Sequence, residues 1–420
     1  MIAPPIPKTP EETGIERESL LKLLGKTLYV HGTMTPSAIA RETRLPHAVI
    51  ALLIKELMRL QLIEAKGLAG EDMKSELRYA LGGHGQSWAL EAMAQSQYVG
   101  PAPVTLESFQ KQITAQSIAR EHIHRADLIR GMSHLILPSD LIDHLGPAVN
   151  SAKSILLYGE PGNGKTSIAE AVGKIFQETI YLPYCIEVGG QIINFFDATV
   201  HAPATADGEP TANGAGAYDA RWIACRRPVI ITGGELTLHM LDLMFNPVSK
   251  FYEAPIHLRA AGGVFIIDDF GRQQTNPQTI LNRWIIPLER GYDYLTLHTG
   301  RKFAIPFDQL VIFSTNIEPT QLADAAGLRR LYYKIFVPSP TPPDYRKIFE
   351  IECARGGLPF NEQDFEAFFR KYYSGPGNAP AGHHPKYIVD FIASVCDYKG
   401  TEPAMEDTLL DAAWRNLHVI

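Results

Sequence analysis

The sequence predicts an α/β fold: a parallel sheet flanked by helices, with an all-α region after it and an N-terminal winged helix-turn-helix domain before it. Three observations predict the sheet. A loop that fits G-x-x-x-x-G-K-[ST] follows the apolar run 154–158 and precedes a helix that opens at 167–172. A second apolar run, 263–269, ends in two aspartates, and a third, 310–316, ends in Ser-Thr-Asn. Buried parallel strands read as such apolar runs and present their last side chains at one edge of the sheet.

Length and composition limit the class of protein. The 420 residues are enough for two or three domains. Lys and Arg number 39 against 46 Asp and Glu, a net charge of -7, which argues against a dedicated polyanion binder. The four cysteines lie far apart without a C-x-x-C pair, so we expect reduced thiols rather than zinc ligands or disulfides. Neither a signal-peptide core nor an apolar run of bilayer length is present, so we expect a cytoplasmic protein without membrane insertion.

The N-terminal part divides into a short segment and a small domain. Residues 1–14 are rich in Pro, Thr and Glu, so we expect a flexible tail or a strap. Residues 15–95 have the pattern of a winged helix-turn-helix domain. The third helix of that domain, 47–60, is largely apolar, and basic residues exceed acidic ones only slightly, which favours a protein-facing adaptor. DNA binding through this domain stays open as the alternative. The expected elements are helices at 19–28, 35–43 and 47–60 and strands at 62–65 and 77–81.

Prolines 101 and 103 predict an extended linker, because two prolines in three residues favour extended backbone. The whole chain is then divided into a tail at 1–14, a winged helix-turn-helix domain at 15–95, a linker at 96–108, a nucleotide-binding α/β domain at 109–340 and a helical region at 341–420.

The loop at 159–167, called the phosphate loop below, has the composition of a phosphate cradle. Its glycines permit positive φ angles, so that successive N–H groups can point at a polyphosphate without an intervening side chain. Lys165 adds a compact positive charge for the outer phosphates, and Thr166 offers a hydroxyl to Mg²⁺. The helix that follows brings its positive N-terminal end to the same place. The residues expected to bind the nucleotide here are Gly159, Glu160, Pro161, Gly162, Asn163, Gly164, Lys165, Thr166 and Ser167.

The acidic pair and the asparagine at the strand ends predict the rest of a phosphate-hydrolysing site. Asp268 is placed to hold Mg²⁺ through water, whereas Asp269 is placed to orient or deprotonate an attacking water molecule. Asn316 can position that water against a γ-phosphate. The expected ligands are therefore ATP and Mg²⁺.

These motifs in this order, followed by Gly-Leu-Arg-Arg-Leu at 327–331, resemble the AAA+ ATPases over about residues 109–420. The resemblance implies a five-stranded parallel sheet, a helical lid and a ring, usually of six subunits, with ATP at the subunit interfaces. It makes Lys165 and Thr166 the Walker A pair, Asp268 the Walker B metal ligand and Asn316 sensor 1. Arg329 or Arg330 becomes the arginine finger that reaches the neighbouring subunit's γ-phosphate.

A helix at 279–290 and a hairpin at 294–306 that turns at Thr299-Gly300 precede the third strand. A hairpin in this place is similar to the pre-sensor-1 insertion of the AAA+ branch that contains the MoxR proteins, magnesium chelatases and sigma-54 activators. In those relatives such hairpins face the ring pore, which implies work on a client.

The lid is expected as four helices, at 344–355, 361–373, 385–398 and 404–417. Lys386 stands at the position of the sensor 2 arginine, where a lysine cannot make a planar two-point contact with phosphate. Asp269 also departs from the glutamate more common in the family, which implies slow hydrolysis. In the long interval before 264 we expect a flexible loop at 205–220 and a strand within 226–235. The aromatic residues Phe195, Phe196, Phe251 and Tyr252 are expected in the core more than at a client surface.

The sequence therefore predicts an AAA+ ATPase that assembles with copies of itself and remodels a protein partner. Two alternatives remain: an ATPase or regulator that acts on DNA, and a nucleotide switch that does not hydrolyse ATP. The client, the pathway and the size of the ring are not encoded in any motif of the chain.

Overall fold

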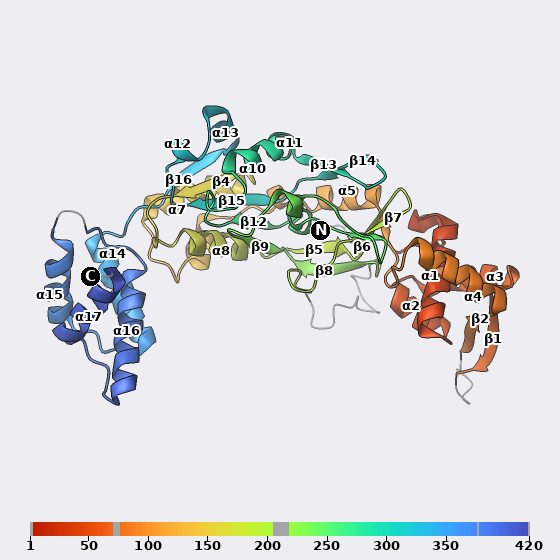
Figure 1. The fold of residues 1–420 in the computed structure, drawn as a ribbon, viewed down its shortest axis with the longest axis horizontal. Helices are drawn as coiled ribbons and strands as arrows, with labels where there is room; N and C mark the ends of the chain where they lie inside the picture. Colours follow the sequence, from red (N-terminus) through yellow and green to blue (C-terminus); the bar gives the residue numbers. More distant parts are fainter. Residues whose placement is uncertain (1–2, 70–75, 205–217, 376–377, 419–420) are drawn as a thin grey trace.

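The structure is a computed structural model that describes residues 3–69, 76–204, 218–375 and 378–418. Figure 1 shows three parts along the long axis, with an N-terminal helical part at one end and four C-terminal helices at the other. A central part that contains most of the strands lies between them. The parallel sheet flanked by helices and the all-α C-terminal region that the sequence predicts are both present.

The N-terminal part contains the three expected helices and two expected strands, with one further helix. Thr35 caps the second helix, because its side chain accepts a hydrogen bond from Ala38 N. The strands pair antiparallel, and the additional helix packs against the first one around buried leucines. The elements are α1 (Arg17–His31), α2 (Pro36–Thr43), α3 (His47–Arg59), β1 (Ile63–Leu68), β2 (Leu77–Leu81) and α4 (Gly83–Gln95).

Residues 3–14 lie as a strap on the central part, where Figure 1 places the start of the chain. The Pro4 carbonyl accepts a hydrogen bond from Asp219 N at 3.0 Å, and the Thr13 carbonyl accepts one from Arg221 Nη1 at 3.0 Å. The segment 96–108 is packed as well, since Ala102 is fully buried and its N–H bonds to Thr43 O. Of the two arrangements expected for the first residues, the contacts fit the strap and not a flexible tail.

The central sheet has five parallel strands in the order β16-β4-β15-β12-β9. Alternate residues of each strand face opposite cores. Val264 and Ile266 belong to the core under α6, α7 and α8, whereas Phe265 and Ile267 belong to the core under α10 and α12. The sheet is therefore covered by helices on both faces. The strands are β4 (Ile155–Tyr158), β9 (Val229–Thr232), β12 (Val264–Ile267), β15 (Leu310–Thr315) and β16 (Tyr333–Phe336).

Two of the flanking helices were predicted from the sequence, and one of these two is broken. The helix expected at 279–290 is divided at the buried Trp284 into two shorter helices. The helices are α5 (Leu106–Ala115), α6 (Arg125–Gly131), α7 (Ser139–Asn150), α8 (Lys165–Ile175), α9 (Ile256–Arg259), α10 (Pro277–Arg283), α11 (Ile285–Arg290), α12 (Pro319–Leu322) and α13 (Ala325–Arg330).

The interval between α8 and β12, together with β3 from before α5, builds a second β-structure that was not predicted from the sequence. A mixed sheet has the order β10-β11-β7-β6-β3, and β5 pairs with β8 beside it. Phe195 and Tyr252 are buried in this layer, as expected for core residues. Most of the tract expected as a flexible loop, 205–217, lies outside the described residues. The strands are β3 (Val104–Thr105), β5 (Thr179–Pro183), β6 (Cys185–Val188), β7 (Gln191–Asn194), β8 (Trp222–Arg226), β10 (Met244–Asn246) and β11 (Phe251–Glu253).

The expected hairpin is present as β13 (Tyr292–Thr296) and β14 (Lys302–Pro306), paired antiparallel. Its inner face is buried: Leu295 and Ile305 join the core of the second β-structure, and Gln110 of α5 donates to Ala304 O at 2.8 Å. The exposed parts of the hairpin are therefore its turn and its outer face, where Tyr294 is 49% exposed.

The C-terminal region consists of the four expected helices around an aromatic core that contains Tyr345, Phe349 and Trp414. In the described part of the chain, no helix has both the length and the apolar character needed to cross a bilayer. The helices are α14 (Pro342–Gly356), α15 (Glu362–Tyr373), α16 (His384–Lys399) and α17 (Asp407–His418).

Candidate functional site

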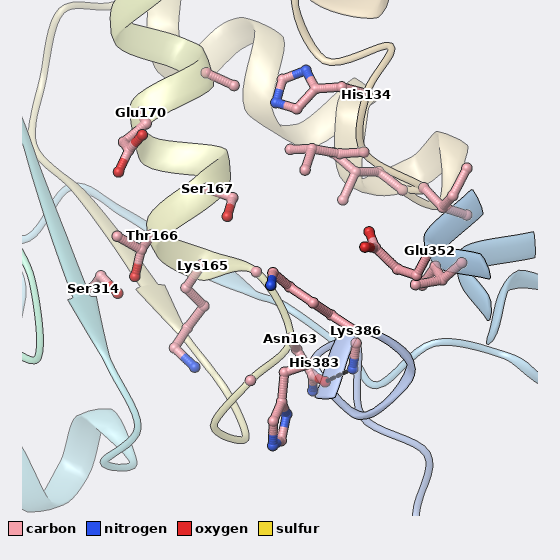
Figure 2. Close-up of a pocket in the computed structure, with 18 of the residues that line it drawn as sticks. His134, Asn163, Lys165, Thr166, Ser167, Glu170, Ser314, Glu352, His383 and Lys386 are labelled. Carbon is pink, nitrogen blue, oxygen red and sulfur yellow. Dashed lines mark hydrogen bonds between the residues drawn. The ribbon is translucent and has the colours of Figure 1, made fainter. Parts of the chain in front are cut away.

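A cavity of about 580 Å³ lies at the carboxyl edge of the central sheet. It is called the loop cavity below, because the phosphate loop forms one wall (Figure 2). The ends of β12 and β15 form a second wall, and α14 together with the start of α16 closes the cavity from the C-terminal region. The segment 134–137, between α6 and α7, completes it. The loop cavity is therefore lined by segments that are far apart in the chain, both from the central part and from the C-terminal helices.

The backbone of the phosphate loop has the conformation that its glycines permit. Gly159, Gly162 and Gly164 have φ angles of 143°, 78° and 82°. A Cβ on Gly159 would lie 2.4 Å from Val337 O, so a larger residue does not fit there. Gly164 caps α8 without a side-chain hydrogen bond, which leaves N–H groups of the first turn directed at the cavity. The loop can therefore surround an anion with backbone donors.

Lys165 is folded back into the loop. Its Nζ donates to Gly159 O at 2.9 Å and to Glu160 O at 2.8 Å, and the residue is 5% exposed. Burial lowers the pKa of this ammonium, and the carboxylates of Asp269 and Asp268 act in the opposite direction. A phosphate group in the loop would offer Lys165 a stronger partner than the two neutral carbonyl oxygens.

Thr166 and Asp268 lie together, as the sequence predicts for a magnesium site. The Thr166 hydroxyl is 2.9 Å and 3.0 Å from the two carboxylate oxygens of Asp268. No cluster of three or more His, Cys, Asp or Glu side chains that could hold a metal occurs among the described residues. One hydroxyl and one carboxylate fit Mg²⁺, which keeps several waters and takes further oxygens from a bound phosphate.

Asp269 and Asn316 also lie together: Asn316 Nδ2 donates to Asp269 Oδ1 at 3.2 Å. Asp269 has a φ of 47°, an unusual conformation for a residue other than glycine. This turn is fixed from two sides. Gln273 Nε2 donates to the carbonyls of Gly233, Asp268 and Asp269, and Thr315 Oγ1 donates to Phe270 O at 2.6 Å. Neither positioning residue was predicted from the sequence. Thr315 directly precedes the expected asparagine, whereas nothing in the local pattern marks Gln273.

The lid touches the phosphate loop directly. Gly382 N donates to Asn163 Oδ1 at 3.2 Å, and the His383 ring lies against Gly162. Burial lowers the pKa of His383, while its hydrogen bond with the Gly162 backbone opposes this shift. Lys386 lines the cavity, as expected, and its Nζ pairs with Asp390 at 2.5 Å.

One end of the loop cavity is apolar. Leu135 and Leu137 line it from the segment before α7, and Ile348 and Ile351 line it from α14. An apolar slot beside a phosphate cradle suits a planar base. These residues were not predicted from the sequence, because the two groups are far apart in the chain and neither contains a motif.

Arg329 and Arg330 lie outside the loop cavity, at the end of α13. The Arg330 side chain is 13% exposed, lies 3.3 Å from Glu289 and donates to Ala326 O at 2.7 Å. Arg329 is exposed, and no ion pair or hydrogen bond of its side chain occurs within the described residues. The two candidates for a finger residue are thus in different environments.

Comparison with known proteins gives limited likeness. A family described as a domain of unknown function (DUF8689) matches residues 341–416, the lid helices. No curated protein matches the sequence. A solved structure of NtrX from Brucella abortus in complex with ADP is similar with 15% identity and a TM-score of 0.40, over 68% of this chain and 56% of that one. A point mutant of RuvB from Thermotoga maritima is similar with 10% identity and a TM-score of 0.40, over 68% and 71%. This chain thus spans little more than half of the NtrX chain, and no functional statement follows from scores of this size.

Proposed function

We propose that the protein is an AAA+ ATPase that binds and hydrolyses Mg-ATP. The observation that carries the proposal is the arrangement around one cavity of the phosphate loop, the Thr166–Asp268 pair and the Asp269–Asn316 pair. The apolar slot at the other end has the chemistry to accept the base. The hairpin before β15 supports the branch that contains the MoxR proteins and sigma-54 activators.

Each side chain has a separate task in this mechanism. The loop N–H groups bind the phosphates, and Lys165 leaves its carbonyl partners to neutralise the outer phosphate oxygens. Thr166 and Asp268 would hold Mg²⁺, which supplies charge neutralisation on the transferred phosphate when it is bound. Asn316 orients the attacking water, and Asp269 accepts its proton.

Phosphate release under multiple turnover tests the site. Lys165→Ala should lower the rate at saturating ATP by at least about a hundredfold, because the developing phosphate charge loses its cation. Lys111→Ala, which removes an exposed lysine paired with Glu107 on α5, is the matched control and should keep the wild-type rate. Equal rates in wild type and Lys165→Ala would contradict the site assignment.

A non-hydrolysing switch is the second candidate, because Asp269 is one methylene shorter than glutamate. The Asn316 contact and the strained backbone of Asp269 favour hydrolysis, since both fix the carboxylate. Asp269→Asn should retain ATP binding and lose turnover. If wild type binds ATP but releases less than one phosphate per subunit at saturating ATP, the switch is correct and the motor is not.

We also propose a ring, of the hexameric kind that the resemblance implies, in which Arg329 acts in trans on the neighbour's ATP. Arg329 is the exposed member of the pair, whereas Arg330 already pairs with Glu289. Subunits with Arg329→Ala and subunits with Lys165→Ala should each be inactive alone. Mixing them should restore activity, because an intact phosphate loop then meets an intact finger. Absence of recovery in assemblies that exchange subunits would exclude a finger at Arg329.

We propose that the partner is a protein and that the N-terminal part binds it. We further propose that this part is a winged helix-turn-helix domain and that the ATPase is cytoplasmic. The exposed side of α3 carries Leu52 and Met58 at 44% and 40% exposure, together with the cations Lys55 and Arg59. Such a mixed apolar and basic surface suits contact with a protein better than contact with the phosphates of DNA. Salt-dependent binding of a DNA duplex by the full chain, lost on Lys55→Ala with Arg59→Ala, would favour the DNA-acting alternative.

A further inference from the structure

A second cavity, of about 550 Å³, lies between the N-terminal part and the second β-structure. Its walls come from α1, the end of α4, the turn between β6 and β7, and the turn that precedes β11. Three lysines line it: Lys22 and Lys26 from α1, and Lys250 from the turn before β11. We call it the lysine cavity. It shares no lining residue with the loop cavity. Figure 1 shows that α1 and α4, which line the lysine cavity, lie at the opposite end of the molecule from α14 and α16, which line the loop cavity.

The three ammonium groups converge on the last turn of α4. Lys26 Nζ donates to Ser96 O at 3.0 Å, Lys22 Nζ to Gln95 Oε1 at 3.1 Å, and Lys250 Nζ to Ala94 O at 2.5 Å. These acceptors are neutral oxygens, and the helix end contributes only about half a negative charge. An ammonium has three N–H donors, so these contacts leave donors on each lysine for a further partner.

Carboxylates do not balance this positive charge. Lys22 pairs with Glu18 at 2.8 Å, where Glu18 is exposed. Glu187 also lines the cavity and contributes one negative charge, because its partner Gly190 N is a neutral donor. In the described part of the chain, no carboxylate pairs with Lys26 or Lys250. The cavity therefore keeps a net positive charge.

Lys26 is the most constrained of the three. The residue is 5% exposed, and burial, aided by the charge of Lys22, lowers the pKa of its ammonium to about 8. A buried cation without a counter-ion is unfavourable, so an anion in the cavity would relieve it. Three convergent lysines match a dianion, whereas a carboxylate would need only one of them.

We propose that the lysine cavity binds a small organic phosphate, whose phosphate group contacts Lys22, Lys26 and Lys250. The non-ionic part of the ligand lies against the apolar wall formed by Ile15, Leu23 and Ile192. The cavity volume lies within the range of small-molecule sites. Because the lysines come from both sides of the junction, the ligand joins the N-terminal part to the central part.

Calorimetric titration of the full chain tests this proposal. Phenyl phosphate, benzoate and phenol carry the same ring with two, one and no negative charges, and Mg-ADP is present throughout to occupy the phosphate loop. We expect one equivalent of phenyl phosphate to bind, at least about tenfold more tightly than benzoate, and phenol not to bind. Benzoate binding as tight as phenyl phosphate, or no binding of either anion, would overturn the proposal.

Variants locate the site. Lys26→Met and Lys250→Met should each weaken phenyl phosphate binding at least tenfold, whereas Lys399→Met, an exposed lysine at the end of α16, should leave it unchanged. Lys250 and Lys22 are not buried, so Lys250→Met and Lys22→Met keep the test valid if Lys26→Met fails to fold. Binding that survives all three variants, or that is lost only in Lys165→Ala, places the ligand elsewhere and contradicts the proposal.

Discussion

Two lysines in this molecule are equally buried and stand in opposite electrostatic surroundings. Lys165 and Lys26 are both 5% exposed, and both ammonium groups donate to main-chain carbonyls. Burial lowers the pKa of each, but two aspartates oppose the shift at Lys165, whereas Lys22 adds to it at Lys26. At the phosphate loop, neighbouring carboxylates thus offset part of the charge of the buried lysine. At the lysine cavity, the buried lysine instead lies beside a second positive charge.

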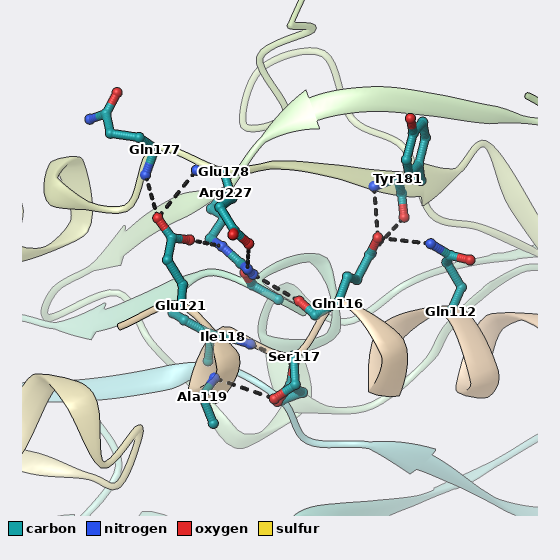
Figure 3. Close-up of polar contacts among 12 residues, drawn as sticks. Gln112, Gln116, Ser117, Ile118, Ala119, Glu121, Gln177, Glu178, Tyr181 and Arg227 are labelled. Atoms are coloured by element: carbon teal, nitrogen blue, oxygen red, sulfur yellow. Dashed lines mark hydrogen bonds and ion pairs between the residues drawn. The ribbon is translucent and has the colours of Figure 1, made fainter. Parts of the chain in front are cut away.

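Arg227 shows what a purely structural buried cation looks like in the same chain. Its side chain is 1% exposed and binds Glu121 at 2.7 Å and Glu178 at 3.2 Å (Figure 3). Its Nη1 also donates to the carbonyls of Gln116 and Gly262. Carboxylates and carbonyls thus occupy most of its donors, and it lines neither of the two cavities. The two buried lysines lack this saturation, which is why a ligand is the expected partner for them.

This comparison predicts that nucleotide protection is lost in one lysine variant and kept in the other. At an ATP concentration a hundred times Kd, ligand binding adds about 2.7 kcal/mol to the stability of the native state, which raises Tm by several degrees. Lys165→Ala should lose this increase, and Lys26→Met should keep it. Scanning calorimetry with and without Mg-ATP measures both, and loss of the increase in Lys26→Met would break the distinction between the sites.

Replacing Arg227 should destabilise the fold without removing a ligand site. Arg227→Met leaves the Glu121 carboxylate without its partner in a largely buried position, which we expect to lower the free energy of unfolding by about 3–5 kcal/mol. Urea unfolding provides the measurement. Lys111→Met, which removes an exposed lysine paired with the exposed Glu107, is the control and should change stability by less than about 1 kcal/mol.

The pH dependence of stability should distinguish Lys26 from an ordinary lysine. Its folded-state pKa of about 8 lies below the ordinary value of 10.5, so between these values the unfolded chain binds more protons than the native one. The penalty for the buried charge is therefore full below pH 8, at most roughly 3 kcal/mol, and disappears as the pH rises toward 10.5. Lys26→Met should be more stable than wild type at pH 7, and this advantage should shrink by pH 10 in urea titrations. A constant difference over that range would show that Lys26 does not titrate there.

The smallest effect is expected at Lys386. It is exposed and paired with Asp390, so it can be only a weak phosphate contact. Lys386→Ala should raise the KM for ATP by roughly threefold with little change in kcat. A loss comparable with that of Lys165→Ala would instead make the lid lysine an essential contact.

The parts that the sequence predicts well are those whose chemistry is local. Each of these motifs follows an apolar strand: the phosphate loop, the two aspartates and Asn316. Parallel strands bring their carboxyl ends to the same edge of the sheet. The pairs Thr166–Asp268 and Asn316–Asp269 are found at that edge. The four lid helices and the hairpin have local patterns too, and all of them are present.

The parts that were missed depend on contacts between distant segments. Short strands such as β6 and β7 do not alternate clearly between apolar and polar residues. The second sheet is therefore evident only from the pairing of its strands in the tertiary structure. Gln273 fixes the turn of Asp269 through carbonyl groups that any sequence possesses.

The sequence by itself determined that the phosphate loop, the Thr166–Asp268 pair and the Asp269–Asn316 pair occur at one edge of one sheet, because each motif ends or follows a strand that is recognised locally. Only the tertiary structure decided which residues close the loop cavity, which of Arg329 and Arg330 is exposed, and that Lys22, Lys26 and Lys250 meet at the end of α4. The physical reason is that burial and electrostatic surroundings depend on neighbours in space. Lys165 lies in a motif and Lys26 in an ordinary amphipathic helix, yet folding removes both from water to the same extent.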